Sequence, residues 1–291
     1  MRDCVQVCYK HKFISHSGSV SYDLGCAYQQ TCSHLTGSIF GKRRSEGRRQ
    51  ICSECCNSTR LCNRDLPCFH TVSHGTILPR ECSDIADVKT GVYDIYPDGV
   101  LPAVPVYCVV NGIKKWTVIQ RRINGCTDFY RGWEAYKEGF GNSSGEYWLG
   151  NENMHKISSH GRHALRVELS DFDNQDKYAE YKTFSIGDEQ DGYQLAVGGY
   201  SGNAGDSLTY GHSGMKFSTF DSDNDKYYTN NCAKLHEGAW WYARCYASNL
   251  NGKYLPGRID YSVSGDKSVV WHSWRGDDYG LKSTKMMIRK Y

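Results

Sequence analysis

The chain has 291 residues, a formal net charge of +3 and 39% hydrophobic residues. That length accommodates two domains, and so small a charge gives no reason to expect a nucleic acid or an anionic membrane as a partner. No apolar run in the sequence is long enough to span a bilayer. The 22 tyrosines and 7 tryptophans predict that aromatic side chains supply much of the core.

The 14 cysteines indicate an extracellular protein that is held together by disulfides. Most of them crowd the N-terminal part of the chain, at Cys4, Cys8, Cys26, Cys32, Cys52, Cys55, Cys56, Cys62 and Cys68. Zinc is disfavoured because the pair Cys52-x2-Cys55 has no second pair at zinc-binding spacing. Sequons at Asn57 and Asn142 agree with secretion. Because no signal peptide precedes Cys4, we expect the natural N-terminus to lie upstream.

Composition divides the sequence into three parts. Residues 1–68 form a cysteine-, serine- and glycine-rich module, residues 69–80 resemble a linker, and residues 81–291 form a larger domain with short β-like runs. No internal repeat, collagen period or coiled-coil heptad is present in the sequence. We therefore expect a small module joined to one domain of ordinary size.

The larger domain is predicted to mix strands with a few helices. A helix is expected at 83–89, opened by Ser83 and Asp84, and a second at 130–138. Strands are expected at 116–120 and 164–169, both bounded by turn-forming residues.

An acidic loop stands out at Asp221–Asn231, where Asp221, Asp223 and Asp225 alternate at two-residue spacing. Three like charges so close repel one another unless they are solvated or bound to a cation, and Ca²⁺ prefers several hard oxygens. Lys226 and Cys232 stand where an EF-hand loop needs Gly and Glu, so this is not an EF-hand. Spacing alone leaves a calcium loop and a solvated acidic turn both open.

A series of motifs across 81–291 resembles a fibrinogen-like domain of the ficolin, tachylectin and mollusc lectin type. In chain order they include Cys82-Ser83-Asp84-Ile85, Gly91-Val92-Tyr93-Asp94-Ile95-Tyr96-Pro97, Trp116-Thr117-Val118-Ile119-Gln120-Arg121-Arg122, Gly145-Glu146-Tyr147-Trp148-Leu149-Gly150-Asn151, Asn231-Cys232-Ala233 and Gly238-Ala239-Trp240-Trp241-Tyr242. The resemblance implies an α+β fold with a central antiparallel sheet, short helices and an irregular subdomain for calcium and ligand.

The resemblance also implies a calcium site in the acidic loop. Its ligands would be the carboxylates of Asp223 and Asp225 and the backbone carbonyls of Tyr227 and Thr229. One residue more than in most relatives separates Asp225 from Cys232, so the carbonyl of Tyr228 or Asn230 could replace that of Thr229. Calcium would shape the ligand site beside it.

A ligand site next to this loop is the second implication. The family's disulfides correspond to Cys82–Cys108 and Cys232–Cys245, and the peptide Arg244–Cys245 would be cis, with its N–H groups facing an acetyl oxygen. The further ligand positions are His236, Tyr246, Tyr261, Ser262 and one of Asp277 or Tyr279. His236, Tyr246 and Ser262 depart from the family's usual residue types, so the altered pocket could prefer a different ligand, or none. Trp240, Trp241 and Trp271 are interpreted as core.

Two features of this domain stay outside the resemblance. Cys126 is left over, and it could join a partner chain, pair with Cys68 or stay free. Arg275-Gly276-Asp277 spells an integrin-like tripeptide, which we interpret as incidental because so short a motif arises often by chance.

The N-terminal module resembles the closing half of a three-finger domain of the lymphocyte-antigen/urokinase-receptor type. The resemblance rests on Cys26-x5-Cys32 followed by Cys55-Cys56-x5-Cys62-Asn63. It implies a small disulfide-rich β module with the pairs Cys32–Cys55 and Cys56–Cys62, and with Cys26 joined to Cys4 or Cys8. Cys52 and Cys68 are extra. Because spacing does not determine connectivity, an unrelated cysteine-rich linker remains open.

The resemblance as a whole predicts a secreted, calcium-dependent pattern-recognition lectin of innate immunity. Its ligand would be an acetylated glycan of the N-acetylglucosamine or N-acetylgalactosamine type, and disulfide-linked copies would raise its avidity. The alternative is an adhesion or receptor-ligand module that binds a protein. An enzyme is not expected, because the sequence holds no G-x-S-x-G or H-E-x-x-H motif.

Overall fold

The computed structural model describes residues 78–259 and 267–291 with their side chains, and residues 6–15, 20–28 and 48–56 as strands. The chain divides into two compact units, Met1–Ile77 and Leu78–Tyr291. Each unit is described by itself.

The N-terminal unit contains a three-stranded antiparallel sheet. Its strands are β1 (Gln6–Ser15), β2 (Val20–Tyr28) and β3 (Arg48–Cys56), in the order β2-β1-β3. This agrees with a small β module. Several predicted positions lie outside the residues described with side chains, namely Asn57 and the half-cystines Cys32, Cys55, Cys56 and Cys62. The three-finger interpretation and its pairings therefore stay predictions.

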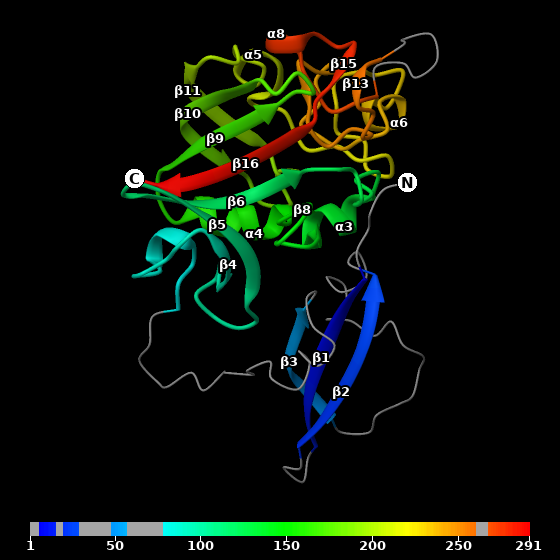
Figure 1. The fold of residues 1–291 in the computed structure, drawn as a ribbon. Coiled ribbons are helices and arrows are strands. Elements are labelled where there is room, and N and C mark those ends of the chain that lie inside the picture. Colours follow the sequence, from blue (N-terminus) through cyan, green and yellow to red (C-terminus); the bar gives the residue numbers. More distant parts are fainter. Residues whose placement is uncertain (1–5, 16–19, 29–47, 57–77, 260–266) are drawn as a thin grey trace. The chain divides into compact units, whose positions relative to one another are not determined.

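The C-terminal unit is built on a nine-stranded sheet with the order β11-β10-β9-β16-β6-β5-β4, and with β8 pairing both β6 and β7 (Figure 1). The strands are β4 (Gly91–Ile95), β5 (Val104–Asn111), β6 (Lys114–Arg122), β7 (Phe140–Gly141), β8 (Tyr147–Trp148), β9 (His163–Ser170), β10 (Asp176–Ile186), β11 (Leu195–Gly202) and β16 (Ser283–Lys290). Neighbouring strands are antiparallel. The predicted central antiparallel sheet is confirmed, and so are the predicted strands at 116–120 and 164–169.

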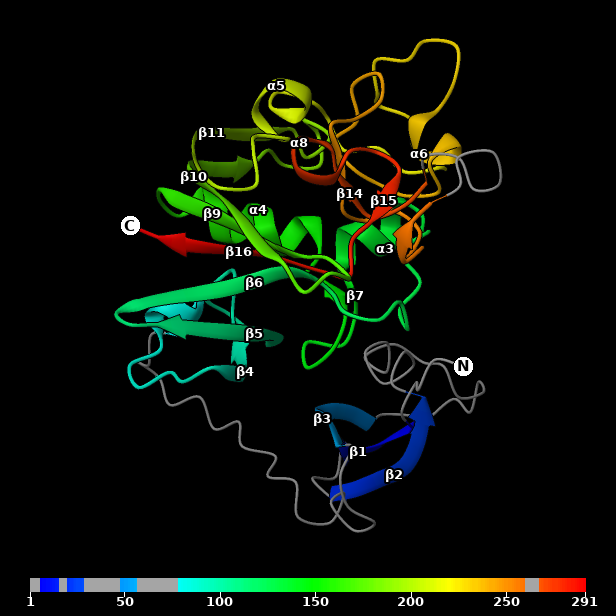
Figure 2. The same cartoon turned by 45° about the horizontal axis from the view of Figure 1, so that its top comes forward.

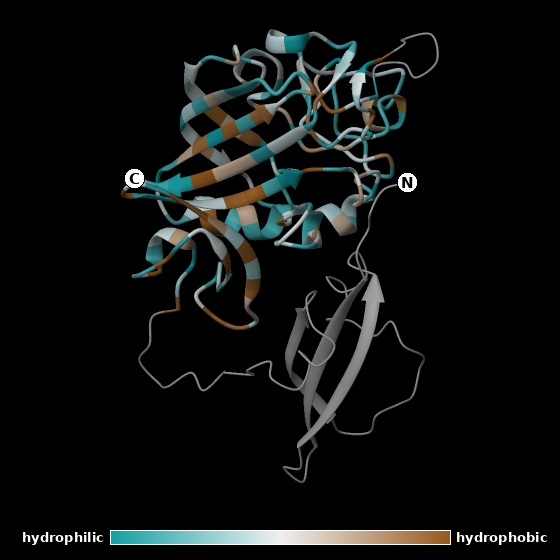
Figure 3. Ribbon diagram, in the orientation of Figure 1, coloured by the Kyte–Doolittle hydropathy of each residue, from teal (hydrophilic) through white to brown (hydrophobic). Residues whose placement is uncertain are grey.

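Apolar and polar residues alternate along β9, as the bands on this strand in Figure 3 show, so their side chains point to opposite faces of the sheet. In β9, Leu165 and Val167 are buried, whereas Arg166 and Glu168 are partly exposed. On the polar face Arg166 Nη1 lies 3.0 Å from a Glu180 carboxylate oxygen on β10. Such pairs between opposite charges on neighbouring strands support the register of the sheet.

Two helices, α3 (Trp133–Glu138) and α4 (Asn151–Ser159), pack beside the sheet (Figures 1 and 2). The helix expected at 130–138 starts only at Trp133, because the backbone of Gly132 is extended. The prediction of a helix at 83–89 is wrong beyond the first turn. Only the 3-10 helix η1 (Cys82–Asp84) forms there, and the backbone of Ile85 is already extended.

The remaining short elements gather at one end of the sheet (Figure 1). They are α5 (Thr209–His212), α6 (Cys232–Leu235), β12 (Ser248–Asn249), β13 (Gly257–Arg258), β14 (Val270–Trp271), α8 (His272–Arg275) and β15 (Tyr279–Gly280). Trp240, Trp241 and Trp271 are fully buried among them, as expected of core residues. Elements of two to four residues cannot fix their own conformation, so bonds from side chains to backbone must do so.

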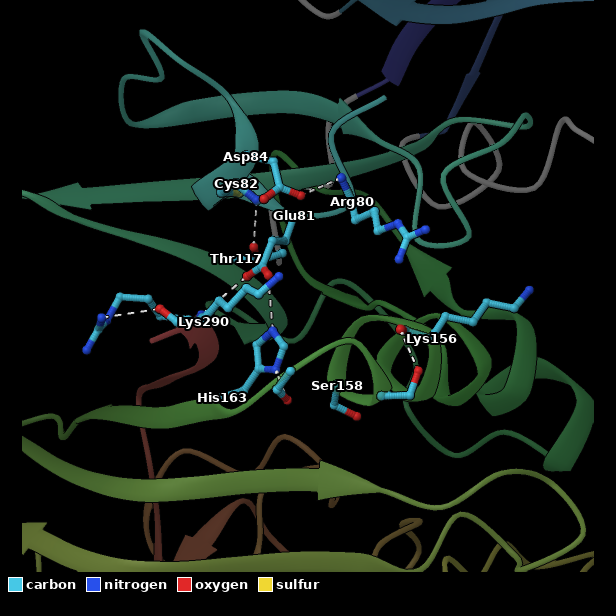
Figure 4. Close-up of polar contacts among 12 residues, drawn as sticks. Arg80, Glu81, Cys82, Asp84, Thr117, Lys156, Ser158, His163 and Lys290 are labelled. Carbon is cyan, nitrogen blue, oxygen red and sulfur yellow. Dashed lines mark hydrogen bonds and ion pairs between the residues drawn. The ribbon is translucent and has the colours of Figure 1, made fainter. Parts of the chain in front are cut away.

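The start of the unit is joined to the middle of the sheet through buried Glu81 (Figure 4). Its carboxylate lies 3.1 Å from His163 Nε2 on β9 and accepts a bond from Lys290 N on β16 at 3.3 Å. The next residue, Cys82, donates its N–H to Thr117 Oγ1 on β6 at 2.9 Å. Among the residues that the structure describes, no helix is long and apolar enough to cross a membrane.

Candidate calcium and ligand site

Two disulfides have both half-cystines among the described residues of the C-terminal unit, and both pairings agree with the prediction. Cys82–Cys108 joins the start of the unit to β5, and Cys232–Cys245 closes a short loop. We call residues 232–245 the disulfide loop and keep the name acidic loop for 221–231. Cys126 is disulfide-bonded as well, so the option that it stays free is wrong.

The first aspartate of the acidic loop belongs to the fold. Asp221 Oδ1 accepts the N–H of Trp133, the first residue of α3, at 2.9 Å and the hydroxyl of Thr219 at 2.6 Å. The first N–H groups of a helix have no partner within it, so the carboxylate supplies one. Gly132 allows this approach, since a Cβ at that position would collide with Asp221.

The other two aspartates lie together. Asp225 accepts the N–H of Tyr227 and the N–H of Cys232, one on each carboxylate oxygen and both at 2.7 Å, and its own N–H lies 3.3 Å from Asp223 Oδ1. Burial, and after it the like charge of Asp223, raise the pKa of Asp225 against the lowering effect of the two N–H donors. A divalent cation would relieve this repulsion.

The oxygen atoms of the acidic loop are of the kinds that calcium binds. Each Asp225 oxygen accepts one N–H and keeps a lone pair, and so does the carbonyl of Tyr227, which accepts Asn230 N at 2.9 Å. The backbone of Thr229 is on an exposed stretch. Within the described part of the chain, no three histidine, cysteine or acidic side chains converge as metal ligands. Calcium would therefore need carbonyls besides Asp223 and Asp225, and oxygen ligands of both kinds suit it.

The acidic and disulfide loops are bonded to each other. Lys226 N donates to the carbonyl of Ala243 at 3.0 Å, and the guanidinium of Arg244 lies over the ring of Tyr227, 4.9 Å from its centroid. The peptide Arg244–Cys245 is cis, as the resemblance implied. A change in the acidic loop would therefore be transmitted to Arg244.

Two of the predicted ligand residues are brought together by the fold. The rings of His236 and Tyr246 meet edge to face with centroids 4.7 Å apart, and Tyr242 packs 6.3 Å from both. His236 is buried and Tyr246 is partly exposed. This cluster adjoins Arg244 and Cys245, so four predicted positions form one continuous group.

The other predicted ligand positions are described only in part. Tyr261 and Ser262 lie outside the described residues. The hydroxyl of Tyr279 accepts a bond from Phe172 N at 3.0 Å, and the guanidinium of Arg275 lies 5.1 Å from the centre of its ring. The ligand roles of these three residues stay predictions.

The tripeptide Arg275-Gly276-Asp277 has its side chains engaged within the domain. Arg275 pairs with the buried carboxylate of Asp171 and, at 2.9 Å, with Asp173. Asp277 lies 3.0 Å from His272 Nδ1. These contacts agree with the interpretation of the motif as incidental.

One residue beside the site escaped the sequence analysis. His212 is fully buried at the end of α5, and its ring bonds to the backbone of Trp241, Ala247 and Ser248. A single histidine with no partner at ligand spacing carries no signal in the sequence, so only the fold reveals it.

The sheet, the two disulfides and the irregular end define a fibrinogen-like domain, and comparison with known proteins agrees. The family described as "Fibrinogen beta and gamma chains, C-terminal globular domain" matches residues 78–291. The chain belongs to this family.

Among curated relatives, bovine microfibril-associated glycoprotein 4 is 48% identical over 223 residues, which cover 73% of this chain and 86% of the relative. Bovine fibrinogen-like protein 1 is 44% identical over 225 residues, which cover 72% and 71%. Neither name describes an enzyme, a ficolin or a tachylectin.

Two solved structures are also similar. The fibrinogen-like globe domain of human ANGPTL2 is 41% identical with a TM-score of 0.68, covering 73% of this chain and 99% of that domain. Lamprey fibrin D-dimer, solved with the peptide ligand Gly-His-Arg-Pro-amide, is 33% identical with a TM-score of 0.68, covering 76% and 75%. The chain therefore carries a recognition domain of the fibrinogen type.

Proposed function

We propose that residues 78–291 form an extracellular, calcium-dependent recognition domain whose ligand is a protein. The ligand would bind at the joined acidic and disulfide loops. The cysteine content supports secretion. The peptide held by the related lamprey fibrin supports a protein ligand.

The observation that carries the proposal is a series of hydrogen bonds that leads from Asp225 of the acidic loop to the predicted ligand residues of the disulfide loop. The Asp225 carboxylate accepts the N–H of Cys232. Lys226 donates its N–H to the carbonyl of Ala243, the residue before Arg244. A bound calcium ion would supply the positive charge that keeps Asp223 and Asp225 together. The exposed guanidinium of Arg244 would then bind carbonyl or carboxylate oxygens of a partner, with Tyr246 adding apolar contact.

Calcium binding is tested by titrating Ca²⁺ into chelator-treated protein and measuring the heat of binding. Asp223→Asn should weaken binding by about tenfold or more, since a charged ligand is lost. Asp191→Asn is the matched control, because Asp191 is exposed and lies outside the acidic loop. Equal calcium affinity of all three proteins would contradict the site.

The protein ligand is tested by capture from an extracellular-matrix extract on immobilised full-length chain. The expected result is a defined set of proteins that is retained with calcium and lost both with chelator and in the Arg244→Glu variant. Lys182→Glu, on the exposed surface of β10, is the charge-matched control. Retention that ignores both calcium and Arg244 would argue against this site.

A second candidate is the acetyl-binding lectin. The contact between His236 and Tyr246 favours it, because the resemblance assigns both positions to the ligand site, although with residue types that differ from the family's usual ones. Retention on immobilised N-acetylglucosamine with calcium, abolished by free acetate, would support the lectin. Passage straight through, with calcium binding intact, would reject it and leave the protein ligand.

A further inference from the structure

His212 connects two segments that flank the proposed ligand residues. Its Nδ1 lies 2.8 Å from the carbonyl oxygen of Trp241, and its Nε2 lies 3.0 Å from both Ala247 N and Ser248 N. The ring is fully buried, so water cannot replace these partners.

The partners determine the protonation state of the ring. A carbonyl oxygen can only accept and a backbone N–H can only donate, so Nδ1 carries the hydrogen and Nε2 is bare. Burial lowers the pKa of His212 to about 4, against the raising effects of its bond to Trp241 and of the Asp206 carboxylate. Asp206 is the charged group that acts on the His212 ring among the described residues, and the aromatic ring of Trp240, which lies edge to face with it, is uncharged. The neutral form is therefore the one present at neutral pH.

These three bonds enclose the part of the chain that would face a ligand. Trp241 precedes residues 242–246, which contain the cis peptide and Tyr246, and Ala247 with Ser248 follows directly. Ala247 has further contacts besides its bond to His212. Its carbonyl accepts the N–H of His272 at 3.0 Å, and Gly211 packs so closely against its methyl group that a Cβ at Gly211 would lie 3.2 Å from it. Segment 242–246 is thus anchored at both ends by one imidazole.

We infer that His212 is a positioning residue of the ligand site, whose neutral Nδ1–H imidazole holds both ends of segment 242–246. An imidazolium would point an Nε2–H at two other N–H groups, so the segment would have to move when the ring becomes charged. The inference rests on the proposed function for the identity of the ligand site, but its anchoring geometry can be tested without any ligand.

The first test is nitrogen NMR of the full-length wild-type protein with labelled histidine. The expected signals for His212 are a protonated Nδ1 and a bare Nε2 that persist down to about pH 4. A protonated Nε2 at neutral pH would overturn the inference.

The second test uses two amide variants and hydrogen exchange. The amide of His212→Gln can place its oxygen near the former Nε2 and accept the two N–H groups. That of His212→Asn reaches only the position of Nδ1 and keeps the bond to Trp241. Exchange at Ala247 and Ser248 should accelerate by about tenfold in the Asn variant and much less in the Gln variant. Equal protection in wild type and the Asn variant would overturn the inference.

Protein capture separates this inference from the proposed function. If positioning matters, the Asn variant loses the proteins captured by wild type and the Gln variant recovers them, while calcium affinity stays unchanged in both. If wild type captures nothing in a calcium-dependent way, the proposed function fails, whereas the NMR and exchange results still decide the anchoring role. Undiminished capture by an Asn variant with loosened Ala247 and Ser248 amides would overturn the positioning role.

Discussion

The three aspartates of the acidic loop differ in role because their carboxylates contact different groups. Asp221 accepts a helix N–H and a hydroxyl, whereas Asp225 accepts the N–H of Tyr227 in the acidic loop and that of Cys232 at the start of the disulfide loop, and lies beside Asp223. Spacing made the three aspartates equivalent in the sequence, and their hydrogen bonds separate one structural carboxylate from two candidate calcium ligands.

This division predicts opposite effects for two alanine substitutions. Asp221→Ala should lower the free energy of unfolding by about 1 kcal/mol, as for a lost helix cap, and leave calcium affinity unchanged. Asp223→Ala should weaken calcium binding and change the stability of the calcium-free protein little. Urea denaturation and calcium titration on both variants measure the two effects. A loss of calcium binding in Asp221→Ala would show that the assignment is wrong.

A second residue with a demanding environment is buried Glu146. Its Oε1 accepts the N–H groups of Ile123, Asn124 and Gly125 at 2.7, 3.0 and 2.8 Å, and its Oε2 accepts Thr127 N at 2.8 Å. Glu146→Gln would place an NH₂ group against at least one of these donors. We expect a loss of about 3 kcal/mol, measured by denaturation. Glu134→Gln, exposed and on α3, is the control and should cost well under 1 kcal/mol.

At the scale of elements, the two-residue strands β13 and β15 illustrate how close backbones approach in the irregular end of the domain. Gly280 of β15 pairs with Gly257 of β13, and a Cβ on Gly280 would collide with the carbonyl of Leu255 and the hydroxyl of Ser268. The carbonyl belongs to the backbone and cannot rotate away. Side-chain bulk at this position is therefore excluded by packing rather than by backbone conformation.

Gly280→Ala should therefore lower the free energy of unfolding by about 2 kcal/mol or more. Gly91→Ala in β4 is a suitable comparison, because the nearest atom to its new Cβ would be 3.8 Å away on the Tyr93 ring. The two melting curves should separate clearly. Coincident melting temperatures would mean that the Leu255 backbone moves aside without cost.

For the whole molecule, stability should fall as the pH drops from about 6.5 to about 4. The folded state depresses the pKa of His212 from 6.5 to about 4, so within this window the unfolded chain binds a proton that the folded chain does not. The full effect is about 3 kcal/mol. Denaturation at pH 7, 5.5 and 4 measures it, and His212→Gln should flatten the slope. A wild-type slope that survives this substitution would assign the effect to other groups.

If the protein is secreted, its accessible sequon should be N-glycosylated. The sequon Asn142-Ser143-Ser144 lies in the turn between β7 and β8, where Asn142 is partly exposed and its side-chain oxygen accepts the N–H and hydroxyl of Ser144. Expression through a eukaryotic secretory pathway should add a glycan at Asn142. Mass spectrometry before and after enzymatic deglycosylation tests this, and an unmodified peptide in secreted material would contradict it.

The sequence by itself determined the family, the antiparallel sheet, the pairs Cys82–Cys108 and Cys232–Cys245 and the cis peptide Arg244–Cys245. The family and the sheet follow from short motifs in a fixed order and from strand alternation, which depends only on neighbours along the chain, whereas the two pairs and the cis peptide are what the resemblance implies. The predicted length of the helix near Cys82 was wrong. The helix propensity of the residues after Asp84 is overridden there, because the backbone becomes extended at Ile85.

Only the tertiary structure decided which polar groups meet. Asp221 reaches Trp133 across 88 positions, His212 reaches Ser248 across 36, and Glu81 reaches His163 across 82. No local pattern encodes such pairs, because each is made by elements that pack together from distant parts of the chain. The physical reason is that a buried polar group must find a partner wherever the fold provides one, at any separation in sequence.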